Sequence, residues 1–175
     1  MLLEEIRRSN LQAMIVRAAD FYGPDAPNSF LHSVVFERLK AGKSPQWLGN
    51  PKAHHTFSFT QDAGRAIAAL GQLKTAFGQT WHLPASKEVM TGEGFVRLAC
   101  DLSGQPFRLQ LAPLWMAKLM GIFIPMMREN QEMMYQLLYD YQFDSSKIAA
   151  AFGLQATPYR EGIRRTLAQA EQDRP

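Results

Sequence analysis

Cysteine is nearly absent from this sequence of 175 residues, in which Cys100 is the only one. A single cysteine cannot form a disulfide within the chain, and it cannot provide the several thiolates of a structural zinc site. The leucine and alanine before it indicate a thiol that packs in a core. This cysteine content is consistent with a reducing compartment such as the cytoplasm.

Long hydrophobic runs are missing as well. The longest apolar stretch, residues 113–127, contains Lys118 and is interrupted by Gly121 and Pro125. It falls short of the roughly 20 apolar residues that a membrane-spanning helix needs. The first ten residues, MLLEEIRRSN, carry too many charges for a secretory signal. We therefore expect a soluble, cytoplasmic protein without a membrane span.

Clustered positive charge is the third absence. The net charge is +3, but lysine and arginine are interspersed with acidic residues and do not alternate with stacking aromatics, so we expect no nucleic-acid partner. What is present is typical of a globular protein, with 46% hydrophobic and 20% charged residues. A length of 175 residues fits a single domain with one core.

Two segments have the composition of buried parallel strands. Residues 12–19 (QAMIVRAA) form an apolar run with little alternation, and residues 79–83 (QTWHL) form a second short run. Such runs are typical of strands that helices cover on both faces. Two strands are too few for a self-sufficient sheet. We therefore expect another structural element to lie beside them.

The remaining segments predict a mixed α/β chain whose second half is mostly helical. Asn28 or Ser29 is placed to cap a helix that ends at Gly42, and Asp62 is placed to cap a helix bearing Ala66, Ile67 and Leu70. Short strands are predicted at 47–50, 56–60 and 106–111. Further helices are predicted at 1–9, from Thr91, over 113–141 with a break at Pro125, from Asp144 or Ser145 to Gly153, and from Thr157.

Several motifs then combine into a resemblance. Residues 15–24 (IVRAADFYGP) resemble the strand and loop that follow the catalytic tyrosine and lysine in extended short-chain dehydrogenase/reductases, the NAD-dependent epimerase/dehydratase family. Residues 55–62 (HTFSFTQD) and 78–84 (GQTWHLP) are similar to that family's next strands, and residues 143–158 to its closing helices. The resemblance covers nearly all 175 residues and implies a Rossmann-like α/β fold with a mostly helical substrate domain.

The family's cofactor motifs are missing from this sequence. It contains no Gly-x-x-Gly-x-x-Gly turn, which would bring backbone amides against a pyrophosphate, and no tyrosine followed four residues later by lysine. Hydride chemistry needs a cofactor held against that pair. We therefore expect residues 1–175 to be a single C-terminal portion of the fold, truncated and inactive alone. NAD or NADP is its cofactor only by resemblance.

The resemblance also suggests site residues. Ala18 and Ala19 match positions that line the nicotinamide end of the cofactor, and Asp20 matches a substrate-facing position that is usually asparagine. His55 falls where many members carry an arginine for a sugar-nucleotide diphosphate. A neutral imidazole binds anions more weakly than guanidinium does. We therefore expect a sugar-like or other hydroxyl or carbonyl substrate, without a firm case for a nucleotide sugar.

Other interpretations of the same residues stay open. Ala18 and Ala19 could simply pack in a strand, Asp20 could cap a loop, and Arg17 needs a partner if its strand is buried. A metal site at His54 and His55 is disfavoured because neighbouring strand residues point to opposite faces. The functional alternative is a non-catalytic protein-binding module. It would use an exposed strand edge and the Met-rich segment 114–127, and a homodimer could cover the edge.

Overall fold

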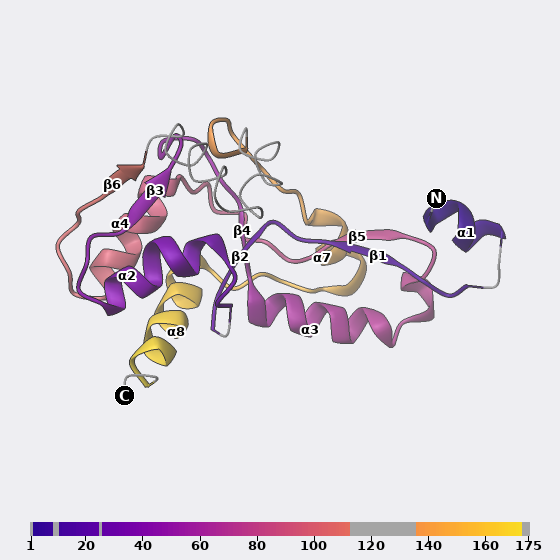
Figure 1. The fold of residues 1–175 in the computed structure, drawn as a ribbon. Coiled ribbons are helices and arrows are strands. Elements are labelled where there is room, and N and C mark those ends of the chain that lie inside the picture. Colours follow the sequence, from indigo (N-terminus) through magenta and orange to yellow (C-terminus); the bar gives the residue numbers. More distant parts are fainter. Residues whose placement is uncertain (1, 9–10, 25, 113–135, 173–175) are drawn as a thin grey trace.

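The computed structural model describes residues 2–8, 11–24, 26–112 and 136–172. Helices and very short strands are interspersed over the first two thirds of the chain (Figure 1). In chain order they are α1 (Leu2–Arg8), β1 (Ile15–Arg17), β2 (Asp20–Tyr22), a π-helix (His32–Phe36), α2 (Glu37–Lys40), β3 (Gln46–Leu48), β4 (Phe57–Phe59), α3 (Thr60–Gly71), a 3₁₀ turn (Lys74–Ala76), β5 (Thr80–His82), α4 (Gly92–Leu102), β6 (Gln110–Ala112), α7 (Ser146–Phe152) and α8 (Tyr159–Gln172).

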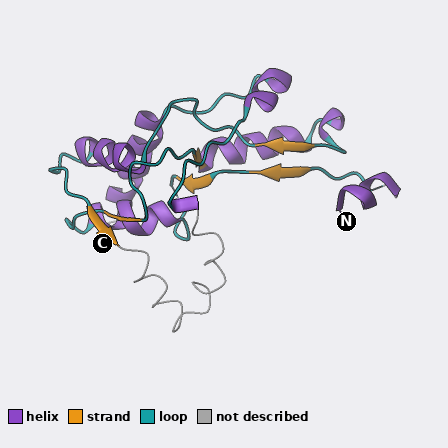
Figure 2. Ribbon diagram, turned by 90° about the horizontal axis from the view of Figure 1, so that it is seen from above, coloured by secondary structure: helices purple, strands orange, loops and turns teal. Residues whose placement is uncertain are grey.

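The strands form three separate parallel pairs. β1 pairs with β5, β2 with β4, and β3 with β6. Figure 2 shows β1 and β5 side by side, with Ile15 opposite Thr80 and Arg17 opposite His82. Both segments predicted as buried parallel strands are thus confirmed as a parallel pair, although each strand is only three residues long. We call β1 and β5 together the strand layer.

Helices cover one face of the strand layer within the described residues. Val16 and Trp81 face a cluster with Leu70 of α3 and Ile148 of α7. Arg17, next to Val16 and pointing to the opposite face, is exposed to solvent. The expectation that helices cover both faces, which would bury Arg17, is therefore wrong for the part of the chain that the structure describes. An apolar run by itself does not show which of its faces has a neighbour.

A second group of side chains is enclosed by neighbouring residues on all sides, and we call it the aromatic core. The aromatic core consists of Tyr22, Phe57, Phe59, Phe95 and Tyr159, each almost fully buried. The rings of Phe57 and Phe95 meet edge to face with centroids 4.8 Å apart, and the backbone N–H of Phe57 donates a hydrogen bond to Tyr159 Oη at 3.1 Å. Helices α2, α4 and α8 gather at this end of the molecule (Figure 1). The core fixes β2 and β4 relative to these helices.

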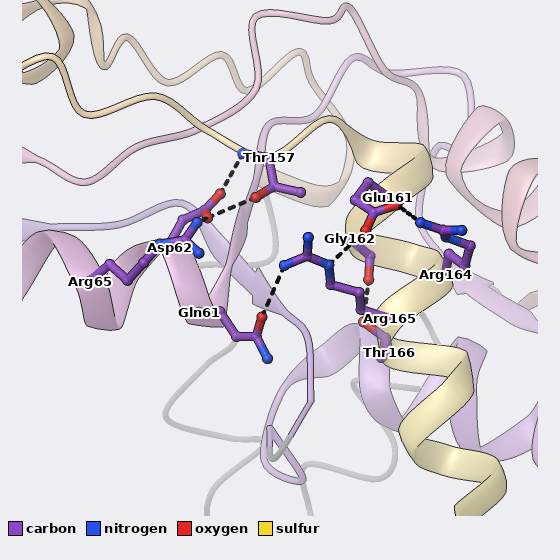
Figure 3. Close-up of polar contacts among 9 residues, drawn as sticks. All are labelled: Gln61, Asp62, Arg65, Thr157, Glu161, Gly162, Arg164, Arg165 and Thr166. Atoms are coloured by element: carbon purple, nitrogen blue, oxygen red, sulfur yellow. Dashed lines mark hydrogen bonds and ion pairs between the residues drawn. The ribbon is translucent and has the colours of Figure 1, made fainter.

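Asp62 corrects one sequence expectation. Helix α3 begins at Thr60, so Asp62 lies within its first turn and does not cap it. Its buried carboxylate instead accepts hydrogen bonds from Thr157 N at 2.5 Å and Thr157 Oγ1 at 2.8 Å, and it pairs with Arg65 (Figure 3). The carboxylate thus ties the start of α3 to the segment that leads into α8.

Other predicted helix ends are confirmed. Ser29 Oγ accepts a hydrogen bond from His32 N at 3.0 Å, and Thr91 Oγ1 accepts one from Gly94 N at 3.0 Å. Gly153 ends α7 with a left-handed φ of 65°, as a glycine C-cap does. β6 lies at 110–112, later than the strand predicted at 106–111. Most of the helical region predicted over 113–141, including the Met-rich segment, lies outside the described residues.

Candidate functional site

A cavity of about 700 Å³ opens where β1 ends and β2 begins. Its walls come from the β1–β2 connection, the loop and turn that precede the π-helix, and the first two turns of α3. The described lining residues are Ala18, Ala19, Asp20, Phe21, Ala26, Pro27, Asn28, Ser29, Phe30, Thr60, Ala63, Gly64, Ile67, Gln136 and Tyr141. The carboxyl ends of parallel strands are where α/β folds bind their ligands.

Ala18 and Ala19 form the part of the wall nearest to the strand layer. The backbone N–H of Ala19 donates a hydrogen bond to the buried Ser58 Oγ at 3.3 Å, which fixes the chain as it passes from β1 to β2. Ala18 also contacts the cluster beneath the strand layer. Because both side chains are single methyl groups, they take up little space at the cavity wall.

Asp20 lies at the start of β2, where its backbone pairs with Phe57. The residue is exposed to solvent at the cavity, and no described residue donates a hydrogen bond or forms an ion pair with its carboxylate. The surrounding wall removes part of its hydration, which raises the pKa of Asp20 above its usual 3.8. An acceptor without an internal partner is therefore available in the cavity.

The loop opposite Asp20 is held by a close backbone approach. Thr60 Oγ1 donates a hydrogen bond to the Pro24 carbonyl oxygen at 3.2 Å. Gly23 has a φ of 144°, and a Cβ at this position would lie 2.0 Å from Thr60 Oγ1. Only glycine fits both the conformation and the space. The Tyr-Gly-Pro sequence thus brings the loop against the first residue of α3.

Apolar side chains that sequence reasoning did not assign to the site also line the cavity. Phe21 is 39% exposed and Ile67 is 44% exposed. Phe30 lines the cavity and also meets Trp47 edge to face at 5.7 Å. The only available signal was the position of Phe21 directly after Asp20. The helical pattern of α3 does not separate Ile67 from the buried Ala66.

His55 does not line this cavity. It is 3% exposed, stacks on Phe57 with ring centroids 6.0 Å apart, and meets Trp47 edge to face at 5.9 Å. Burial lowers the pKa of His55 below its usual 6.5, which keeps the ring neutral at pH 7. Among the described residues, neither His55 Nε2 nor Trp47 Nε1 has a hydrogen-bond partner. The backbone of His55 forms a β-bridge with the backbone of Tyr141. Tyr141 lines the cavity, and this bridge is the link between His55 and the site.

His54 points away from its neighbour, as the strand pattern predicted. Its Nδ1 lies 3.1 Å from Asp140 Oδ2, and its backbone N–H donates to Asp140 Oδ1 at 2.8 Å. These two hydrogen bonds, with a smaller electrostatic contribution from His54, lower the pKa of Asp140 below its usual 3.8. In the part of the chain that the structure describes, no group of three histidine, cysteine or acidic side chains is placed to hold a metal ion.

We compared the chain with known protein families, sequences and structures. No protein-family model and no curated protein sequence matches the chain. Solved structures do match. UDP-glucose 4-epimerase from Thermotoga maritima, solved with UDP-glucose, has a TM-score of 0.76 and 17% identity, over 98% of this chain and 50% of its own. The dTDP-glucose 4,6-dehydratase from Bacillus anthracis, solved with NAD, has a TM-score of 0.74 and 14% identity, over 98% and 48%.

The UDP-glucose 4-epimerase from Thermus thermophilus, solved with NAD, gives the same result, with a TM-score of 0.73 and 17% identity. The chain has the same fold as about half of each of these epimerase and dehydratase structures. This confirms the fold expected from the motifs. The chain spans about half the length of the solved structures that it matches. Among the described residues, no helix combines the length and apolarity needed to cross a bilayer.

Proposed function

We propose that this chain is the substrate-facing part of an NAD(P)-dependent epimerase, dehydratase or reductase-like oxidoreductase. The observation that carries the proposal is the cavity at the carboxyl end of β1, next to a parallel strand layer whose β1 edge pairs with no described strand. An edge of this kind accepts a further strand. The match to about half of each of several NAD-containing structures supports the same arrangement.

Each wall of the cavity has a role in this proposal. Ala18 and Ala19 leave room for the nicotinamide ring, and the Asp20 carboxylate accepts hydrogen bonds from the substrate. His55 contributes indirectly, because its backbone positions Tyr141 and its buried ring supports Trp47. The bound cofactor would supply hydride transfer, while these residues bind and orient the two ligands and exclude water.

The chain lacks the acid/base tyrosine and lysine and the glycine-rich turn, so these groups must come from residues outside the 175. We therefore infer that the chain alone neither holds the pyrophosphate of the cofactor nor catalyses hydride transfer. A polypeptide that joins it to a segment carrying both motifs would complete the sheet and the site.

The test compares two proteins. The reading frame upstream of Met1 is examined for a glycine-rich turn and a Tyr-x-x-x-Lys motif, and the joined polypeptide is expressed beside the 175-residue chain. Titration with NADPH and NADH, followed by nucleotide fluorescence, should show saturable binding only for the joined protein. Tight saturable binding to the 175-residue chain would contradict the proposal. The absence of both motifs upstream would favour the alternative below.

The alternative is a non-catalytic protein-binding module. It is favoured by the edge of β1, which pairs with no described strand, and by the exposed Arg17 beside it, both of which a partner or a second copy could cover. Light scattering of the purified chain over a concentration series separates the two candidates. A stable homodimer that persists on dilution supports the module, and a monomer supports the incomplete oxidoreductase.

A further inference from the structure

The charge of the cavity indicates what kind of ligand group it accepts. Asp20 is the one formally charged residue among the described lining residues. The other polar lining groups are neutral and belong to Asn28, Ser29, Thr60, Gln136 and Tyr141. The field that these described residues impose on a ligand therefore comes mainly from one carboxylate.

Two of the neutral groups are already engaged within the protein. Ser29 Oγ accepts the backbone N–H of His32, and Thr60 Oγ1 donates to the Pro24 carbonyl oxygen. The Asp20 carboxylate has no such partner. An ionised carboxylate offers only acceptor atoms and binds donors more strongly than a neutral group does. It is the strongest unengaged acceptor of the described wall.

His55, which lies apart from the cavity, does not offset this charge. His55 is buried among Trp47 and Phe57, and burial lowers its pKa, so it is neutral at pH 7. A phosphate near Asp20 would meet a like charge, and the described wall supplies no guanidinium or ammonium to compensate for the repulsion. The described residues therefore favour donors and disfavour anions.

We propose that the cavity binds a small substrate whose group facing Asp20 donates hydrogen bonds and carries no negative charge, such as the hydroxyls of a free sugar or a protonated amine, and that it rejects substrates that carry a nucleoside diphosphate. This inference rests on the proposed function and specifies its substrate class. It separates this chain from the matched Thermotoga maritima epimerase, whose structure contains UDP-glucose.

Ligand-observed NMR on the 175-residue chain at pH 7 tests the inference with three probes: glucosamine, glucose and UDP. The wild-type chain should bind glucosamine and glucose saturably, and it should not bind UDP. Asp20→Asn should weaken glucosamine binding about tenfold, because the charge-assisted hydrogen bond is lost, and should weaken glucose binding less. Asp101→Asn, an exposed position on α4 outside the cavity, is the matched control and should change neither affinity.

Three results would overturn the inference: saturable UDP binding that competes with glucosamine, no saturable binding of either sugar, or equal affinities in Asp20→Asn and wild type. Thermal melting of each variant confirms that it is folded before its affinity is compared. The cofactor titration of the joined protein is read separately. NADPH binding with no sugar preference would therefore retain the proposed function and reject this substrate class.

Discussion

The aromatic core and the strand layer lie in the same chain, but they are completed to different degrees. Phe57 and Phe95 are enclosed on every side by β4, α4, α8 and the π-helix. The strand layer has α3 and α7 on one face, while Arg17 on the other face is exposed and the outer edge of β1 pairs with no described strand. The comparison indicates that stability resides in the aromatic core, while the strand layer leaves one edge and one face open within the described residues.

The largest expected effect comes from cutting into the aromatic core. Phe57→Ala should lower the free energy of unfolding by about 3–5 kcal/mol, because it leaves a cavity among closely packed rings. Phe21→Ala, at an exposed ring of the cavity wall, should cost less than about 1 kcal/mol. Urea denaturation followed by circular dichroism measures both. Equal losses would contradict the contrast between the two regions.

The second effect tests the link between α3 and the segment before α8. Asp62→Ala should cost about 2–3 kcal/mol, since Thr157 loses both of its acceptors in a part-buried site. Its ion pair with the largely exposed Arg65 adds little. Asp101→Ala on the surface of α4 is the control and should stay within about 0.5 kcal/mol of wild type. A loss at Asp62 no larger than the control would show that the contact is dispensable.

Substitutions at two separate glycines test the packing with a smaller expected change in stability. A Cβ at Gly162 of α8 would lie 2.4 Å from Tyr22 Oη, and Tyr22 is enclosed in the aromatic core, so Gly162→Ala should cost about 1–3 kcal/mol. Gly71 at the end of α3 has open space, so Gly71→Ala should leave stability unchanged or raise it by about 0.5–1 kcal/mol. Thermal melts of both variants should shift in opposite directions or differ clearly in size.

The smallest effect is a pH dependence from the buried His55. Since burial lowers its folded pKa below the usual 6.5, the unfolded chain takes up the proton first as the pH falls. As the pH falls below 6.5, the free energy of unfolding should therefore decrease until the folded pKa is reached. At pH values well above 6.5, His55 should contribute no slope. Denaturation from neutral pH to about pH 5 measures the slope. In His55→Phe this part of the slope should vanish, and an unchanged slope would rule His55 out as its source.

Local sequence signals predicted local structure well. The helix starts at Ser29 and Thr91 and the stop at Gly153 follow from hydrogen bonds and dihedral angles within a few residues. Asp62 was misassigned because its acceptors are used by Thr157, which lies far along the chain and cannot be foreseen from neighbouring residues.

Three of the cavity residues could be picked out from the sequence because they belong to one local motif. Ala18, Ala19 and Asp20 are consecutive, so a single motif placed all three at the cavity. His55 lies apart from the cavity because its ring is buried against Trp47 and Phe57. Ile67 lines the cavity and is 44% exposed, and the helical pattern of α3 does not predict that exposure.

The central claim is that the strand layer is part of a larger sheet whose other strands lie outside these 175 residues. Hydrogen exchange of the backbone amides tests this claim most directly. In the 175-residue chain, the amides of β1 should exchange much faster than those of β4, and joining the upstream segment should slow exchange in β1 while leaving β4 unchanged. If β1 is already as protected as β4 in the isolated chain, the strand layer is complete by itself and the account is wrong.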